Sequence, residues 1–277
     1  MHTNKLSITV LSDNHAAYGL ETEHGFALWI ETADKKILFD TGQGAAMPHN
    51  AVALGLDMAG ANLVALSHGH FDHTGNLSGV LHQASHAKLY LHPEALLDRY
   101  SIHAEPKSIG MPTASRDAVE ALPHHQRHWI MGPTEMTEGV WLTGPVPRKT
   151  VFEDTGGPFF KDEQGQQTDD ISDDLSLWIQ TPAGLVVCLG CCHAGVINTL
   201  DFITGKADDK RIVALIGGMH LLHAKQTRLE HTADELKRYA IAHVFPCHCT
   251  GNNACDYLTE RLGSMVHPGY AGMKVGF

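Results

Sequence analysis

Residues 67–76 hold three histidines and one aspartate within six positions, namely His68, His70, Asp72 and His73. Neutral imidazoles and carboxylates are ligands for zinc, and also for iron or manganese. The first two histidines are two residues apart, so a tight loop can direct both at one ion. The last two residues are adjacent and diverge, which suits a second ion nearby. The cluster therefore predicts a metal site, and the competing interpretation is a solvated polar loop.

The residues around the cluster indicate how it is positioned. The apolar run 62–66 is typical of a buried strand, so the cluster lies on a loop at the edge of a sheet. Gly69 removes a side chain between two ligands and permits an unusual backbone angle. Asp40 follows another apolar strand, 36–39, and we expect it at the same edge. There it would accept the second N–H of a metal-bound imidazole, although an aspartate capping a turn is the alternative.

Three apolar segments in the second half each stop sharply before a histidine: 185–189 before His193, 212–216 before His220, and 243–246 before His248. We expect His193 to complete the coordination of the ion bound by the first two histidines of the cluster. We expect His248 to complete the coordination of the ion bound by the aspartate and the third histidine. His220 sits in a Gly-Gly turn, so we place it beside the ligands or in the substrate pocket, with metal ligation as the alternative.

The strand and helix patterns predict a single α/β domain over residues 1–277. Strands are expected at 6–11, 26–32, 36–39, 62–66, 87–91, 175–180, 185–189, 212–216 and 243–246, and helices at 43–60, 77–84, 93–100, 196–204 and 225–241. Hairpins and strand–helix units in each half favour two mixed β-sheets face to face with helices outside. This is a four-layer αβ/βα sandwich.

Residues 101–172 are rich in Pro, Gly, His and charged residues, with short strand-like pieces at 126–131 and 140–143. We expect this inserted segment to lie over the active site and to shape the substrate pocket. Arg148 within it is a candidate for gripping an anionic substrate, and a solvated surface arginine is the alternative.

The cluster has the His-x-His-x-Asp-His signature, and with it the chain resembles the metallo-β-lactamase superfamily. The match extends along nearly the whole chain, through 23–28, 30–32, 38–42, 67–75, 144–148, 190–195, 217–221 and 248–251. Together these segments resemble the branch labelled dihydropterinyl-methyl-ribofuranosylaminobenzene-phosphate synthase-like. The resemblance implies the same αβ/βα sandwich, the metal site, and the supporting role of Asp40.

One position departs from the superfamily pattern. Where the superfamily commonly has a bridging aspartate, this chain offers Cys191, Cys192 or His193. Three acids are alternative bridging residues: Asp13, Asp173 and Asp174. We place Asp13 and Cys191 beside the ions or the substrate. Cys247 and Cys249 flank a predicted ligand, but packed thiols are the simpler interpretation.

Composition excludes several classes of protein. The chain has 277 residues, 43% of them apolar, and a net charge of −11, which disfavours nucleic acid as a partner. It has no apolar run of about 18 residues and no signal-like N-terminus, so we expect no membrane span and a cytoplasmic location. The six cysteines all fall in the last third, unlike a disulfide framework. Nine histidines in polar segments are expected at the surface: His2, His24, His49, His82, His86, His103, His124, His125 and His128.

These features predict a metal-dependent hydrolase acting on an ester, phosphoester or related bond of a small, anionic molecule. Two divalent ions, zinc or else iron or manganese, would hold a hydroxide nucleophile. Asp72 would be both a ligand and the residue that orients the nucleophile, and His220 would donate to developing negative charge. The alternatives are the condensation of a pterin with a ribofuranosylaminobenzene phosphate, which the branch label implies, and a non-catalytic metal-binding protein.

Overall fold

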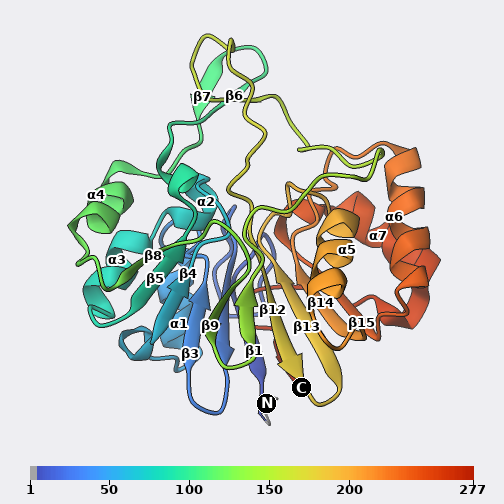
Figure 1. Ribbon diagram of the computed structural model, residues 1–277, viewed down its shortest axis with the longest axis horizontal. Coiled ribbons are helices and arrows are strands. Elements are labelled where there is room, and N and C mark those ends of the chain that lie inside the picture. Colours follow the sequence, from blue (N-terminus) through green and yellow to red (C-terminus); the bar gives the residue numbers. More distant parts are fainter. Residues whose placement is uncertain (1–4) are drawn as a thin grey trace.

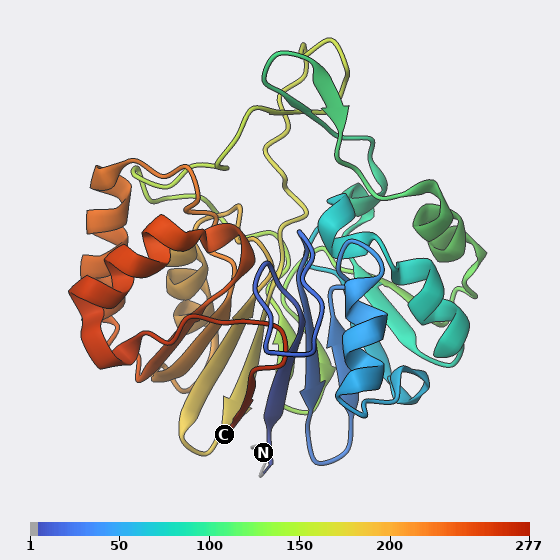
Figure 2. The same cartoon turned by 180° about the vertical axis from the view of Figure 1, so that it is seen from behind.

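Two β-sheets lie face to face in the middle of the molecule, and helices cover the outer side of each (Figure 1). The computed structural model describes residues 5–277, so the surface position expected for His2 lies outside the described residues. Figure 2 shows the same order of layers from behind. Both sheets contain parallel and antiparallel pairs, so the expected four-layer αβ/βα sandwich with two mixed sheets is confirmed.

The first sheet has seven strands and contains the last strand of the chain. In order across the sheet they are β16 (Lys274–Gly276), β1 (Ser7–Ser12), β2 (Ala27–Glu31), β3 (Lys36–Phe39), β4 (Leu63–Ala65), β5 (Lys88–Leu91) and β8 (Arg127–Trp129). Strands β3, β4, β5 and β8 are parallel, whereas β16, β1, β2 and β3 pair antiparallel. The carboxyl ends of β1, β3 and β4 therefore share one edge.

The second sheet has six strands, and its parallel part comes from the end of the chain. In order they are β15 (His243–Pro246), β14 (Ile212–Gly217), β13 (Gly184–Leu189), β12 (Ser176–Thr181), β10 (Val140–Leu142) and β9 (Thr134–Thr137). The first three are parallel, so their carboxyl ends also meet at one edge. The strands expected in this half of the chain are confirmed.

Helices cover the two outer faces (Figures 1 and 2). On the first sheet lie α1 (Ala46–Ala53), α3 (Leu77–Gln83) and α4 (Thr113–Ala121), and on the second lie α5 (Val196–Lys206), α6 (Gln226–Arg238) and α7 (Asn252–Leu262). Single turns are formed by α2 (Phe71–Thr74) and by the 3-10 helices η1 (Met58–Gly60), η2 (Pro93–Leu96), η3 (His248–Thr250) and η4 (Gly263–Met265). No helix between residues 5 and 277 is both long enough and apolar enough to cross a membrane.

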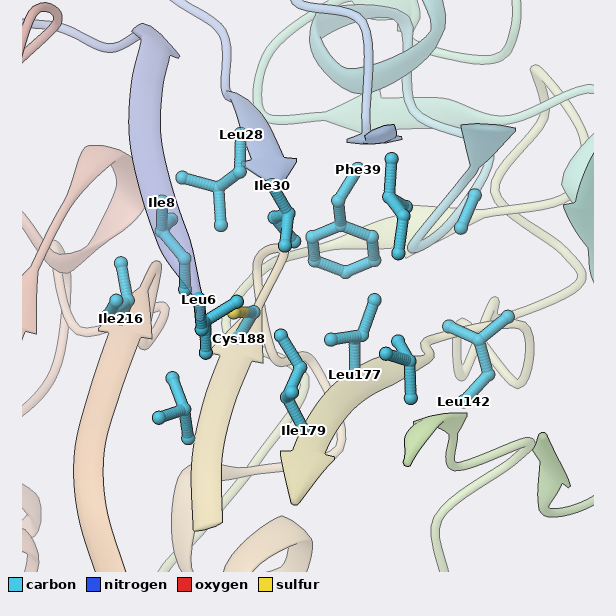
Figure 3. Packing of buried hydrophobic residues seen from close by; sticks show 14 of the residues in the cluster. Leu6, Ile8, Leu28, Ile30, Phe39, Leu142, Leu177, Ile179, Cys188 and Ile216 are labelled. Atoms are coloured by element: carbon cyan, nitrogen blue, oxygen red, sulfur yellow. The ribbon is translucent and has the colours of Figure 1, made fainter. Parts of the chain in front are cut away.

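Alternation along the strands builds three apolar layers. On β2, Leu28 and Ile30 point between the sheets, whereas Trp29 packs against the helices on the outer face. On β12, Leu177 and Ile179 point inward to meet them (Figure 3). Each fully buried side chain of this size stabilises the fold by about 1.5–3 kcal/mol. A third apolar cluster joins the second sheet to α5, α6 and α7.

Several predicted elements are shorter than expected, and others were missed. The helix expected over 43–60 ends at Ala53, because Gly55 adopts a left-handed φ of 69° before η1 begins. The helix expected over 93–100 is only the 3-10 turn η2, and Tyr100 already belongs to a strand. The sequence pattern did not predict α4, α7 or β16.

Segment 101–172 divides between the large sheets and the region above them. Strands β8, β9 and β10 belong to the large sheets. Other parts form a separate three-stranded sheet of β11 (Phe159–Phe160), β6 (Tyr100–Ile102) and β7 (Pro106–Ser108). This small sheet stands above the strand ends (Figure 1). The expectation of a segment laid over the site therefore applies to only part of 101–172.

Candidate metal centre

The loops that follow six strands meet beneath the small sheet. Asp13 follows β1, Asp40 follows β3, the histidine cluster follows β4, and residues 190–193, 218–220 and 247–248 follow β13, β14 and β15. The structure brings His193 and His248 to the cluster, although both are more than a hundred residues away in the chain. The centre therefore takes side chains from both sheets, as expected.

One group of candidate ligands consists of His68, His70 and His193, whose ligand atoms lie within 4.8 Å of one another. Nε2 of His68 is 2.9 Å from Nδ1 of His70. His193 lies 2.8 Å through Nδ1 from the carbonyl oxygen of Thr155, and its buried Nε2 has no hydrogen-bond partner among residues 5–277. Burial, together with neighbouring imidazoles, lowers the pKa of all three histidines. They are neutral at pH 7, which is the form that binds metal.

A second group surrounds the carboxylate of Asp72. Oδ2 of Asp72 is 3.2 Å from Nε2 of His248 and 3.8 Å from Nε2 of His73. His24 also reaches this oxygen, at 3.4 Å, from an exposed position. Although burial opposes the charged form, Asp40 and Asp72 raise the pKa of His73 to about 9. In the absence of a metal, the two carboxylates therefore stabilise a positive charge on this imidazole.

Cys191 lies between the two groups. Its sulfur forms a cluster with His68 and His73, another with His193 and His220, and a third with His248 and Cys249. The Nε2 atom of His73 is 3.1 Å from this sulfur. Cys191 therefore contacts candidate ligands of both groups. The acids considered for the bridging position belong to none of these clusters: Asp13, Asp173 and Asp174.

Cys249 is part of the centre, although sequence reasoning interpreted it as a packed thiol. Burial raises the pKa of Cys191 well above that of an ordinary thiol. The pKa of Cys249 is lowered despite burial, because Cys191 and His220 donate hydrogen bonds to its sulfur. These hydrogen bonds therefore favour the thiolate form of Cys249 over that of Cys191. The position of Cys249 next to His248 was the available signal, whereas Cys247 donates to the Phe245 carbonyl instead.

Two of the histidines assigned to the surface also contact other rings, and one of them is not exposed. His24 is exposed, as expected, but its ring also lies 5.1 Å from that of His248. The only sequence signal for it was its place in a segment that matches the superfamily. His128 is half-buried and stacks on Tyr90, with the ring centroids 4.6 Å apart.

Four buried carboxylates hold the backbone of the site loops. Each accepts a hydrogen bond from one backbone N–H group. Asp40 accepts from Ser67 at 2.7 Å, Asp173 from Gly69 at 2.8 Å, Asp174 from Ala194 at 2.9 Å, and Asp13 from His248 at 2.8 Å. Asp40 also accepts from Nδ1 of His73 at 2.7 Å, the contact expected for it. Asp13, Asp173 and Asp174 therefore position loops instead of bridging the two groups. Burial raises the pKa of Asp13 to about 6 and that of Asp174 to about 7.

The site loops also contain unusual backbone. Four non-glycine residues in these loops have a positive φ: Asp40 at 61°, Cys192 at 58°, His220 at 48° and His248 at 48°. Such strain tends to occur at functional sites. The φ of Gly69 is not in this region, so the unusual angle expected there is wrong. Glycine is required because a Cβ on Gly69 would lie 2.3 Å from the carbonyl oxygen of Ala95.

Comparison with known proteins gives the family. The family model for the metallo-beta-lactamase superfamily matches residues 21–197. The chain belongs to the metallo-beta-lactamase superfamily. A crystal structure of a metal-dependent hydrolase of the beta-lactamase superfamily has a TM-score of 0.82 and 30% identity, covering 98% of both chains.

Two relatives of this protein come from Methanocaldococcus jannaschii. One is named 7,8-dihydropterin-6-methyl-4-(beta-D-ribofuranosyl)-aminobenzene-5'-phosphate synthase; it is 26% identical, over 99% of this chain and 97% of its own. The other is an uncharacterized protein that is 30% identical over 97% of this chain and 99% of its own. The similarity therefore spans the chain, while the names differ.

The donor set fits the divalent metals that the superfamily generally binds. It combines imidazoles kept neutral by burial, the Asp72 carboxylate, and the thiols of Cys191 and Cys249. The partnerless Nε2 of His193 is a second sign, because buried polar atoms are rarely left unpaired.

A cavity of about 350 Å³ opens above the centre. Its walls include Asp72, Cys191 and His220, as well as Phe159 from the small sheet. The Phe159 ring lies 5.3 Å from that of His70 and 6.0 Å from that of His220. His220 is thus in the pocket wall, where it was expected, and its buried Nδ1 has no partner among the described residues.

Arg148 does not line this cavity. It is exposed and donates to the backbone carbonyls of Asp170 and Ile171. Together with Asp174 it lines a different cavity. The expectation that Arg148 grips the substrate over the metal cluster is therefore wrong, because these carbonyls hold its guanidinium elsewhere.

Proposed function

We propose that this protein is a metal-dependent hydrolase with a two-ion centre, acting on an ester, phosphoester or related bond of a small molecule. The observation that carries the proposal is the convergence of two ligand groups on Cys191 beneath a cavity. Superfamily membership supports it, as does the related crystal structure described as a metal-dependent hydrolase. A solvated polar loop, the competing interpretation, would not bury all four residues of the first cluster.

The proposed ligands divide into two sets. His68, His70 and His193 hold one ion, and the second set consists of Asp72, His73 and His248. The sulfur of Cys191 lies between the sets and would be available to ions in both. A thiolate is a soft ligand, so it favours zinc or iron over manganese.

When bound, divalent ions would supply a nucleophile from water near neutral pH and would polarise the attacked oxygen. Asp72 orients the nucleophile from the floor of the cavity. His220, whose Nδ1 is buried in the wall, donates to the negative charge that develops on the attacked group. Phe159 covers the centre and excludes water, which strengthens these interactions.

Alanine variants test the centre. His68→Ala and Asp72→Ala should each lose bound metal, measured by elemental analysis, and all turnover of a panel of phosphodiesters, phosphonates and esters. The exposed His86 provides a matched control, since His86→Ala should keep both. Unchanged metal content in the first two variants would refute the proposed ligands. Full metal with no turnover on any substrate would favour the non-catalytic alternative.

Cobalt substitution tests the sulfur ligand directly. Cobalt-loaded protein should show a thiolate-to-metal charge-transfer band in the near ultraviolet. Cys191→Ser should lose this band, and Cys191→Asp should lose it while retaining two equivalents of metal, because it restores the carboxylate common in the superfamily. A band that persists in both variants would assign the sulfur ligand to Cys249 instead.

Synthase chemistry is the second candidate, since the chain matches a relative named as a synthase over 99% of its length. The product in that name joins a dihydropterin to a ribofuranosylaminobenzene phosphate. Incubating the pure protein with a pterin pyrophosphate and the aminobenzene ribosyl phosphate tests this reaction. A condensed product, detected by mass spectrometry, would favour the synthase, whereas its absence together with turnover of the ester panel would favour the hydrolase.

A further inference from the structure

A second cavity, of about 380 Å³, adjoins the metal cavity. The two have four residues in common: Gly156, Gly157, His220 and His223. Its remaining walls include Lys225, Thr227 and Arg228, at the start of α6. A molecule long enough to pass this shared wall would therefore touch both cavities.

Arg228 pairs with Asp154, which also lines this cavity, but two nitrogens of its guanidinium are left without a partner among the described residues. The residue is only 5% exposed. Its Nη1 donates to Asp154, but Nε and Nη2 have no hydrogen-bond partner among residues 5–277. Asp154 has an exposed carboxylate, so it neutralises the guanidinium only through this one contact. Buried N–H groups of a charged side chain are costly to leave unpaired, which points to an acceptor that enters the cavity.

The start of α6 adds to this positive potential. The N-cap residue Lys225 makes no side-chain capping bond, and the first turn contains no acidic residue. The first N–H groups of a helix have no acceptor within the helix, and they carry the positive end of its dipole. Lys225 and Thr227, both exposed, line the cavity at this point. Guanidinium, ammonium and helix N-terminus together are a typical phosphate site.

The wall between the cavities is tied to the metal centre. Thr155 lines the second cavity next to this wall. Its carbonyl oxygen accepts a hydrogen bond from Nδ1 of His193. The next residue, Gly156, has a φ of 87°, and a Cβ there would lie 1.8 Å from Cδ2 of His220. Gly156 therefore packs directly against His220. A group bound at Arg228 is therefore fixed relative to a candidate ligand and to the proposed donor His220.

We propose that the cavity at Lys225, Thr227 and Arg228 binds a phosphate group of the substrate that does not itself react, while the reacting bond lies over the metal centre. This inference rests on the proposed function and narrows its substrate class to phosphorylated small molecules. It moves the anion-binding role, which the sequence suggested for Arg148, to the start of α6. The sequence signal was Lys225-Gln226-Thr227-Arg228, two cations at the beginning of a predicted helix.

Binding of inorganic phosphate to metal-loaded protein, measured by calorimetry, tests the site. Thr227→Asp places a carboxylate in the cavity at an exposed position where an acid also favours the helix, so the fold should be kept. We expect it to weaken phosphate binding by at least about tenfold, and Arg228→Gln to do the same. Gln226→Asp adds the same charge one residue away, at a position that does not line the cavity, and should change binding by less than about threefold.

A third variant separates this site from the metal centre. His68→Ala, which should lack metal, is expected to bind phosphate as tightly as the unaltered chain if the α6 cavity is the site. Phosphate binding that is lost in His68→Ala and kept in Thr227→Asp would mean that phosphate binds at the ions, and would overturn the inference without affecting the hydrolase. Equal binding of acetate and phosphate would also contradict it, since a carboxylate subsite would then fit as well.

Discussion

Three candidate ligands are oriented by the ring nitrogen that does not face the centre. His73 is held through Nδ1 by Asp40, His193 by the carbonyl oxygen of Thr155, and His248 by Oδ1 of Asn14. In all three the N–H on Nδ1 is donated to an oxygen, so the lone pair on Nε2 is left for a metal. Such contacts fix both the tautomer and the direction of the ring.

Asp40→Asn tests this orientation. Asparagine tolerates the left-handed backbone that Asp40 adopts, so the loop should fold. The substitution removes the negative charge beside His73. We therefore expect metal affinity, measured by competition with a chelator, to fall by about 10–100-fold. Asp34→Asn, in an exposed turn, is the control and should bind metal normally. Equal affinities in the two variants would show that Asp40 only holds the backbone of Ser67.

Local spacing predicted the residues that lie close together in the sequence, and strand patterns predicted those that follow strands. His68 to His73 and His193 were found in these ways. Cys249 and His24 were not assigned to the centre, because what distinguishes them from ordinary residues is a contact between loops of different strands. The position of Arg148 outside the metal cavity was missed for the same reason. Its hydrogen-bond partners belong to a loop with no recognisable sequence pattern.

At the scale of elements, the loop after β4 is fixed by close packing and by a buried ion pair. The Asp173 carboxylate accepts the N–H of Gly69 and also binds Arg99, which is fully buried just before β6. Asp169 pairs with the same arginine at 3.0 Å. The small sheet and the metal loop are therefore joined by one guanidinium. Strand patterns could predict β4 itself, but not this long-range pair.

Gly69→Ala should displace the loop. The added methyl group would meet the Ala95 backbone, so the loop must shift and the fold should lose about 1–3 kcal/mol in urea unfolding. Metal content should fall as well, because His68 and His70 flank the glycine. Gly44→Ala is the matched control, since nothing lies within 4 Å of a Cβ there. If the two variants were equally stable and equally loaded, the close approach to Ala95 would not constrain the loop.

For the whole molecule, the centre and hydrogen bonds between the site loops lie at one edge of two halves that share an apolar core. Phe39 of the first sheet and Leu177 of the second belong to the core between the sheets (Figure 3). Alternating patterns on the strands predicted this core. They did not predict that β16, from the end of the chain, joins the first sheet, since its three residues are too short to show a pattern.

Removing metal should therefore loosen the junction between the halves. A ligand that binds only the folded state stabilises it by about 2.7 kcal/mol when its free concentration is 100 times Kd. We expect a chelator to lower the free energy of unfolding by about this amount, measured by urea titration with and without zinc. His193→Ala removes a ligand from the second sheet alone, so zinc should stabilise it much less, whereas His86→Ala should respond like the unaltered chain. Full stabilisation of His193→Ala by zinc would mean that the other ligands bind the metal without His193, and that His193 does not contribute to holding the two halves together.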